Sequence, residues 1–278
     1  MKITVLIENT GPNDLLIEHG LSLLIENNHS SYLLDAGSTS AFMSNAKALN
    51  VSINNVKCCI LSHGHCDYSG GYDAYLSQNQ NVTVYAMKNV FEQYYSASGG
   101  VLHNIAVPVS IQQNYIHRFT LIDRITQIDE NVYLIPHHSK HLQFISKRSQ
   151  LYIKKNHQFI SDNFSHELSL VFETSKGLII FNSCFHAGLQ NIIEEVKQSL
   201  PNQKIYAFIG GLHLKEKKNG KEICAFSKKE IKIMCEYLIK ENIQLYTGHC
   251  TGLIGFKMLK EIMEKKVHPL ITGSIIEI

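Results

Sequence analysis

The 278-residue sequence predicts a mixed α/β fold in which two β-sheets stack with helices outside them, a four-layer αββα sandwich. Short apolar, β-branched runs bounded by turn residues recur along the chain, as is typical of strands. Other segments carry apolar residues every three or four positions, which indicates helices. The first third is rich in predicted strands, whereas strands alternate with helices toward the C-terminus.

The predicted elements cover most of the chain. The strands are Ile3–Ile7, Leu21–Ile25, Tyr32–Leu34, Val56–Leu61, Val82–Tyr85, Val132–Ile135, Leu168–Phe172, Leu178–Phe181, Ile205–Ile209, Gln244–Tyr246 and Leu270–Ile276. The helices are Ser40–Leu49, Asn191–Leu200, Lys228–Lys240 and Gly255–Lys265. No repeat or linker interrupts them, so we expect a single domain over residues 1–278, with a loop-rich insertion around 96–165 where periodicity weakens.

The composition narrows the class of partner. Lys plus Arg (26) nearly balance Asp plus Glu (24), giving a net charge of +2, so we expect no nucleic-acid partner and instead a small-molecule substrate. No stretch approaches the roughly 18 apolar residues of a transmembrane helix, and the apolar run near Met1 is too short for a signal peptide. We therefore expect a cytoplasmic protein without a membrane partner; the oligomeric state stays open.

Cysteine usage also fits a cytoplasmic protein. The seven cysteines include no C-x-x-C pair, which argues against a disulfide framework and against a zinc ribbon. We expect most of them to be reduced, buried thiols.

The segment His63-Gly64-His65-Cys66-Asp67-Tyr68 carries the strongest chemical signal. It follows an apolar strand and precedes Ser69-Gly70-Gly71. In a loop at a strand end, His63 and His65 can turn toward one point, and Asp67 adds a hard oxygen ligand. The alternative is a polar turn whose side chains satisfy backbone groups. We favour a metal site because three ligand side chains converge.

This H-x-H-x-D pattern with its Gly pair resembles the metal signature of the metallo-β-lactamase-fold superfamily, although Tyr68 stands where a further His is usual. Ordered blocks along the whole chain resemble one branch, the dihydropterin ribofuranosylaminobenzene phosphate synthase-like group. Those blocks are Val5–Asn9, Glu18–Ser22, Leu34–Gly37, Phe42–Ala46, Leu61–Gly71, Ser183–Gly188, Gly210–Leu214 and Gly248–Gly252. The resemblance implies the αββα metallo-β-lactamase-type sandwich, a site at one end of its two sheets and a divalent metal, usually zinc.

Further metal ligands come from the same blocks. His186 lies at a predicted strand-to-helix junction, where a lone His more often caps a helix; the resemblance makes it a ligand. His213 and His249 each follow a late strand beside Gly, and either could be the last ligand, with helix capping as the plain alternative for both. The block around His249 resembles the family best. We therefore expect His249 as the ligand and His213 as a metal or substrate contact.

Other polar residues receive lesser roles. Asp35 resembles a buried Asp that orients the ligand loop by hydrogen bonds without binding metal, with a turn Asp as the alternative. Glu18 and His19 could line the pocket or form an exposed turn. Minor candidate ligands are His137, His138, His141 and His166, and Asp162 and Glu167 are expected to be scaffold.

Tyr68 limits the predicted metal centre. A phenol ligates well only when deprotonated, from a reference pKa of about 10, so the second of two ion sites should be weakened. If that site fills, the ion must lower the pKa of Tyr68 or use another ligand such as His213. We expect one or two divalent ions, with zinc first and iron or manganese as alternatives.

The resemblance implies hydrolysis: a metal-bound hydroxide attacks an ester, amide or phosphoester, and Asp67 orients it or accepts its proton. Two alternatives stay open. One is a pterin-related synthase acting on a phosphorylated substrate, which rests on family analogy. The other is a catalytically degenerate, metal-bearing protein that binds or senses a ligand, which Tyr68 motivates.

Overall fold

The computed structural model describes residues 1–137, 150–218 and 220–278, so the predictions for His138 and His141 lie outside the described residues. The chain forms two compact units. The first comprises Met1–Glu92, Ile105–Asp123 and Leu270–Ile278, and the second comprises Gln93–Asn104 and Arg124–Pro269.

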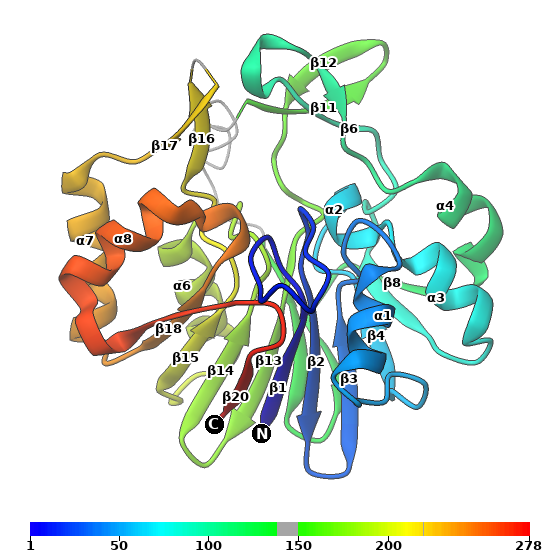
Figure 1. Cartoon of the computed structure of the whole chain (residues 1–278), viewed down its shortest axis with the longest axis horizontal. Helices are drawn as coiled ribbons and strands as arrows, with labels where there is room; N and C mark the ends of the chain where they lie inside the picture. The colour runs from blue at the N-terminus through cyan, green and yellow to red at the C-terminus, as the bar shows by residue number, and fades with distance from the viewer. Residues whose placement is uncertain (138–149, 219) are drawn as a thin grey trace. The chain divides into compact units, whose positions relative to one another are not determined.

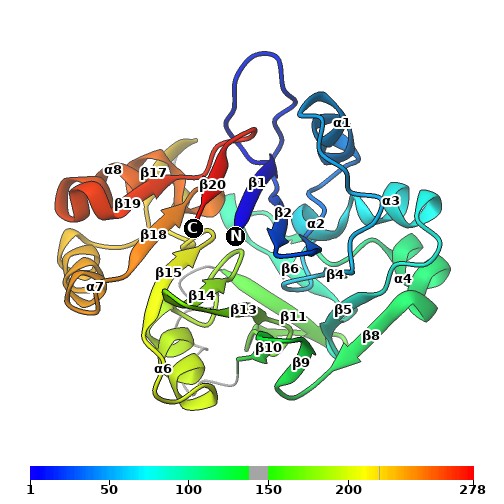
Figure 2. The ribbon, with the colours of Figure 1, turned by 90° about the horizontal axis from the view of Figure 1, so that it is seen from below.

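The first unit is built on a seven-stranded sheet in the order β20-β1-β2-β3-β4-β5-β8 (Figures 1 and 2). Its strands are β1 (Lys2–Ile7), β2 (Ser22–Asn27), β3 (Ser30–Leu34), β4 (Cys58–Ile60), β5 (Val84–Met87), β8 (Phe119–Ile122) and β20 (Ile275–Glu277). Its helices are α1 (Ala41–Ala48), α2 (Cys66–Ser69), α3 (Tyr72–Gln78), α4 (Val109–Tyr115) and the 3₁₀ turn η2 (Ile116–Arg118). Strands β3, β4, β5 and β8 run parallel, so their carboxyl ends share one edge of the sheet.

Both chain ends belong to the first unit. Strand β20 pairs antiparallel with β1, and the amino group of Met1 donates a hydrogen bond to the carbonyl oxygen of Ile278 at 3.0 Å. Figure 1 shows the two termini side by side. The last residues therefore complete the sheet that the first residues begin.

The second unit is built on another seven-stranded sheet, in the order β19-β18-β15-β14-β13-β10-β9. Its strands are β9 (Thr126–Asp129), β10 (Val132–Pro136), β13 (Leu168–Thr174), β14 (Gly177–Phe181), β15 (Ile205–Ile209), β18 (Gln244–Thr247) and β19 (Val267–Pro269). Its helices are α6 (Leu189–Ser199), α7 (Lys228–Lys240) and α8 (Gly252–Met263), with the 3₁₀ turns η1 (Ser98–Gly100), η3 (His249–Thr251) and η4 (Glu264–Lys266). Strands β14, β15, β18 and β19 run parallel.

Two smaller sheets accompany this one. The first has the order β12-β11-β6-β7, and the second is the hairpin β16-β17. Their strands are β6 (Tyr94–Ser96), β7 (His103–Asn104), β11 (Leu151–Lys155), β12 (Gln158–Ser161), β16 (Lys215–Lys218) and β17 (Lys221–Cys224).

The hydrophobic pattern explains the main elements. Strand β14 is buried along its whole length, and its continuous apolar sequence suits a strand covered on both faces. Helix α7 begins with a capping box, in which Ser227 and Glu230 satisfy each other's backbone N–H groups. It buries Ile231, Cys235 and Leu238, which recur at helical spacing.

The C-terminal strand differs from its prediction. Instead of one strand over Leu270–Ile276, β19 ends at Pro269 and β20 begins at Ile275. The chain turns between them, where Gly273 adopts a φ of 85° and the N–H of Ser274 donates to the carbonyl of Ile271 at 2.9 Å. The sequence does not predict this turn because the residues around it are largely apolar. At the turn the chain passes from the second unit to the first.

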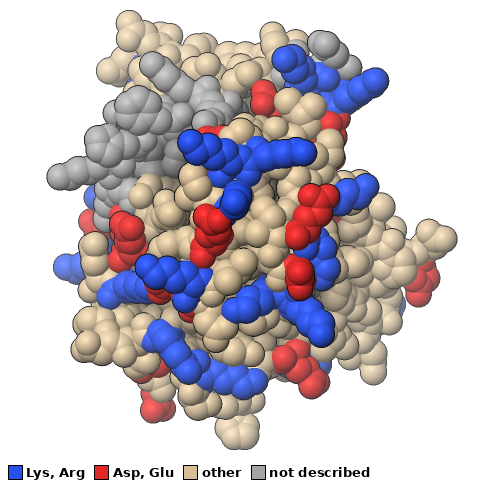
Figure 3. Space-filling view, turned by 90° about the vertical axis from the view of Figure 1, so that its left-hand side faces the viewer, with Lys and Arg blue, Asp and Glu red and all other residues tan. Residues whose placement is uncertain are grey.

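Surface charge is mixed on the face that Figure 3 displays. Over its described atoms, Lys and Arg side chains lie among Asp and Glu side chains. Ion pairs on the helices of the second unit follow the same pattern, with Lys232 and Glu236 3.7 Å apart on α7. Among the described residues, no helix combines the length and hydrophobicity that crossing a bilayer demands.

Candidate functional site

Parallel pairing of β3 and β4 places Asp35 beside the predicted metal loop. Asp35 follows β3 directly and Ser62 lies two residues after β4, while Leu34 pairs with Ile60. The buried Asp35 carboxylate accepts one hydrogen bond from the backbone N–H of Ser62 and one from its hydroxyl, both at 2.8 Å. These bonds fit the predicted role of Asp35, which is to orient the loop.

The same bonds define the protonation of His63. Because the Ser62 hydroxyl gives its proton to Asp35, its oxygen acts as the acceptor for Nδ1 of His63, 2.8 Å away. Nδ1 therefore carries the ring proton, and the lone pair lies on Nε2, the form that a metal ligand requires.

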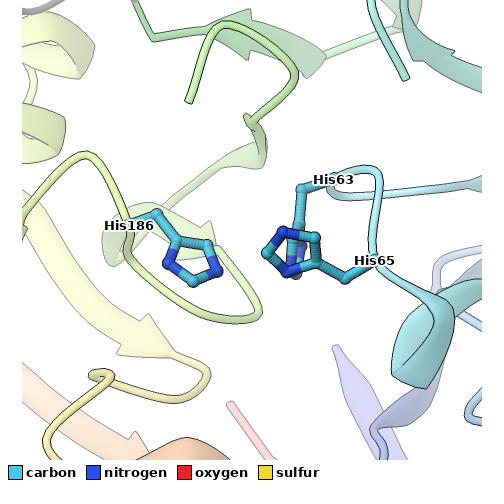
Figure 4. Close-up of side chains that lie close together, drawn as sticks. All are labelled: His63, His65 and His186. Carbon is cyan, nitrogen blue, oxygen red and sulfur yellow. The ribbon is translucent and has the colours of Figure 1, made fainter. Parts of the chain in front are cut away.

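His65 and Tyr68 pack around His63. The rings of His63 and His65 lie 4.5 Å apart, and those of His63 and Tyr68 lie 4.2 Å apart. The Ser69 hydroxyl donates to the carbonyl of His65 at 2.9 Å, which ties the loop to α2. Figure 4 shows the adjacent imidazoles of His63 and His65 on this loop and also draws His186, which comes from the loop after β14.

The Gly pair of the motif has a steric reason. A Cβ atom on Gly70 would lie 2.1 Å from the carbonyl oxygen of Ser38, and one on Gly71 would lie 2.1 Å from that of Ala36. Only glycine lets this segment approach the backbone that follows β3.

Asp67 lies on α2 near the first unit's surface. Its Oδ2 atom is 3.6 Å from Nε2 of His19, whose side chain is 64% exposed. Glu18, by contrast, is engaged by the loop after β3: its carboxylate accepts hydrogen bonds from the N–H of Ser38 at 2.9 Å and the hydroxyl of Thr39 at 2.6 Å. His19 is thus the member of this pair that stands beside a predicted ligand.

In the second unit, His186 lies in the loop after β14. A second buried carboxylate holds this loop, because Glu167 accepts hydrogen bonds from the N–H groups of His186 at 2.9 Å and Ala187 at 2.7 Å. Burial raises the pKa of Glu167 to about 8, although these two bonds lower it. The His186 ring stacks on Phe164 with centroids 4.8 Å apart and lies 4.5 Å from the His213 ring.

His249 begins η3, two residues after the end of β18, in a left-handed conformation with a φ of 49°. It is buried, like the Cys250 that follows it. The carboxyl ends of parallel strands are where α/β sheets commonly bind ligands. His186, His213 and His249 follow three such neighbouring strands, β14, β15 and β18.

Two cysteines that the sequence did not single out surround His213. Sγ of Cys184 lies 3.1 Å from Sγ of Cys250 and 3.3 Å from Nδ1 of His213. The backbone N–H of His213 donates a hydrogen bond to Sγ of Cys250 at 3.2 Å. Burial raises the pKa of the Cys250 thiol, but the hydrogen bond from Cys184 and the neighbouring His213 outweigh it and hold that pKa well below its ordinary value. Their sequence signal was proximity to predicted ligands, in Cys184-Phe185-His186 and His249-Cys250.

The minor histidine candidates have structural partners. Both ring nitrogens of His137 are engaged, Nδ1 with Glu195 at 2.8 Å and Nε2 with Ser169 at 2.7 Å. Nε2 of His166 contacts the Asp162 carboxylate at 3.0 Å, and its ring lies 3.9 Å from that of Tyr94. These contacts favour a scaffold role for both residues.

The Asp35→Asn substitution should weaken metal binding more than its small change in volume suggests. An Asn amide facing Ser62 would donate to the hydroxyl, which would then donate to Nδ1 of His63 and move the ring proton to Nε2. We expect metal affinity to fall about 10- to 100-fold and stability by about 1–3 kcal/mol. Metal competition and urea denaturation measure both, with exposed Asp14→Asn as the control. Unchanged affinity would show that Asp35 is only a turn residue.

Comparisons with known proteins agree with this architecture. A family model described as the metallo-beta-lactamase superfamily matches residues 17–145. The chain is 26% identical over 275 residues, 94% of its length and 90% of the relative's, to 7,8-dihydropterin-6-methyl-4-(beta-D-ribofuranosyl)-aminobenzene-5'-phosphate synthase of Methanocaldococcus jannaschii.

Solved structures extend the likeness to the whole chain. The crystal structure of Tm1679, described as a metal-dependent hydrolase of the beta-lactamase superfamily, matches with a TM-score of 0.82 and 26% identity, covering 100% of this chain and 99% of that one. Zn²⁺-bound PqqB from Methylobacterium extorquens shares the fold, with a TM-score of 0.58 and 11% identity over 100% of both chains. These matches confirm the predicted fold class and the predicted resemblance to the metallo-beta-lactamase superfamily.

Proposed function

We propose that this protein is a metal-dependent hydrolase acting on a small ester, amide or phosphoester. The observation that carries this proposal is the hydrogen-bond chain from Asp35 through Ser62 to His63, which leaves Nε2 of His63 deprotonated beside His65. Such a chain is typical of metal-ligating histidines, whose second nitrogen is held by a hydrogen bond. The match of residues 17–145 to the superfamily model supports the same function.

The proposed ligands in the first unit are His63, His65 and Asp67. The family resemblance adds His186 and His249, which lie in the second unit. Imidazole and carboxylate donors suit zinc, and they also suit iron and manganese. The fit is best supported at His63, whose tautomer is set, and at His186, whose backbone Glu167 holds.

A divalent ion at this position supplies Lewis-acid activation of water and of the substrate oxygen. Asp67 then orients the attacking water or accepts its proton. His19 lies 3.6 Å from the Asp67 carboxylate and is largely exposed, so it can pass that proton to solvent.

Hydrolysis should depend on both the metal and Asp67. We expect protein purified without chelator to contain a divalent metal, to cleave generic nitrophenyl ester or phosphodiester substrates, and to lose that activity reversibly on chelation. Asp67→Asn should lower kcat about 10²- to 10⁴-fold, whereas His117→Ala, at an exposed His of the first unit, should change little. Elemental mass spectrometry and steady-state kinetics measure both effects. Turnover without metal, or none at full occupancy, would disprove the proposal.

Tyr68 should limit the number of bound ions. Tyr68 is fully buried against His63, in the position where the superfamily usually has a His ligand. Tyr68→His restores a neutral nitrogen donor, so we expect more ions per chain by elemental analysis. Tyr68→Phe should leave the count unchanged if the phenol is not a ligand. An unchanged count in Tyr68→His would contradict this role of Tyr68.

A second candidate, a pterin-related synthase acting on a phosphorylated substrate, is supported by the similarity to the Methanocaldococcus jannaschii protein. If it is correct, a phosphorylated pterin-like compound should bind at least about tenfold more tightly than its dephosphorylated form, which corresponds to about 1.4 kcal/mol. Calorimetric titration of the metal-loaded protein measures this ratio. Equal affinities would favour the plain hydrolase.

A further inference from the structure

The second unit contains a compact group of sulfur and nitrogen atoms that the proposed hydrolase does not use. We call Cys184, His213 and Cys250 the thiol cluster. One ligand atom from each residue lies within 4.8 Å of the other two. We propose that the thiol cluster is a separate binding site for a thiophilic divalent cation of the zinc class. The proposal does not depend on the hydrolase, because its ligands differ from those of the proposed metal centre.

The distances suit three ligands on one ion. Sγ of Cys184 lies 3.1 Å from Sγ of Cys250 and 3.3 Å from Nδ1 of His213. Zn–S and Zn–N bonds of about 2.3 and 2.0 Å in tetrahedral geometry place such ligand atoms roughly 3.5–3.8 Å apart. The sulfur atoms therefore need to separate by only some tenths of an ångström to share an ion.

A disulfide is the competing use of two cysteines this close. It requires the sulfur atoms to approach to about 2.05 Å. His213 favours an ion over a disulfide. A disulfide would leave Nδ1 of His213 without a role, whereas an ion would use all three ligand atoms. The backbone N–H of His213 also donates to Sγ of Cys250 at 3.2 Å, which compensates the negative charge that a metal-bound sulfur carries.

The local backbone makes room for the cluster. A Cβ atom on Gly211 would lie 2.4 Å from Sγ of Cys250, so only glycine admits that sulfur. Phe185 and His213 adopt left-handed conformations, with φ of 53° and 49°, which side-chain-bearing residues rarely take. Such conformations persist where the surrounding structure defines them. Cys184 and Cys250 are buried, whereas His213 is half-buried.

An ion in the thiol cluster would cross-link three loops. Cys184 lies in the loop after β14, His213 in the loop after β15, and Cys250 in η3. The first and third of these loops also carry His186 and His249. Occupancy of the cluster would therefore fix the backbone next to two proposed ligands of the hydrolytic metal.

Cadmium titration tests the cluster through a signal that only sulfur ligands produce. When Cd²⁺ is added to fully reduced, chelator-treated protein, a thiolate-to-Cd²⁺ charge-transfer absorption should appear and stop growing once the thiol cluster is filled. Co²⁺ should give the corresponding sulfur-to-metal band. Cys184→Ser and Cys250→Ser should each weaken Cd²⁺ binding at this signal at least tenfold, and His213→Ala should weaken it as well. Cys224→Ser is the matched control, because Cys224 lies in β17 outside the cluster. It should titrate like the parent protein.

The outcomes separate this proposal from the hydrolase. His63→Ala should lose hydrolysis and keep the sulfur band, so a failed activity assay leaves the cluster standing. Because serine variants can fail to fold, the unmodified protein provides the deciding measurement: reduced protein that binds Cd²⁺ without a sulfur band, or binds none, would overturn the proposal. A band of full strength in Cys184→Ser and Cys250→Ser would overturn it too, by assigning the sulfur to another cysteine.

Discussion

The Asp35 carboxylate is the constraint on which the first unit's predicted metal loop depends. It is buried, and the two hydrogen bonds from Ser62 offset its loss of hydration. Strand pairing makes this possible, since parallel β3 and β4 end side by side and deliver the carboxylate to the loop. One side chain thereby fixes a backbone position, a hydroxyl orientation and, through that hydroxyl, the tautomer of His63.

The second unit repeats this device with a different residue. Glu167 is also a buried carboxylate that accepts two hydrogen bonds from a loop carrying a predicted ligand, here the N–H groups of His186 and Ala187. Both donors are backbone N–H groups, so Glu167 fixes the position of the His186 backbone but not the protonation of its ring. The ring is instead held by stacking, with Phe164 at 4.8 Å and a 10° interplanar angle. The chain thus orients two predicted ligand rings in different ways, His63 by a hydrogen bond and His186 by stacking.

The sequence predicts local features well and pairings poorly. Helix α7 has the predicted bounds because its capping box and apolar face are encoded within consecutive residues. The metal motif is likewise contiguous. By contrast, the sequence predicts Glu167 only as scaffold, because its bond to His186, 19 residues away, has no sequence signature. The approach of Cys184 to Cys250, 66 residues apart, depends on the order β14-β15-β18, which periodicity does not encode. The same limit applies to β11, whose antiparallel partner β6 lies far upstream.

The place of the last strand has a consequence for synthesis on the ribosome. The first unit holds both chain ends, and β20 pairs with β1 only after residue 275 has emerged. The large segment Arg124–Pro269 of the second unit is uninterrupted and leaves the ribosome earlier. Domains generally fold as units in the order in which they emerge. Strand β1 therefore keeps an open edge until β20 has emerged, and a chain that lacks β20 would leave that edge available to other chains.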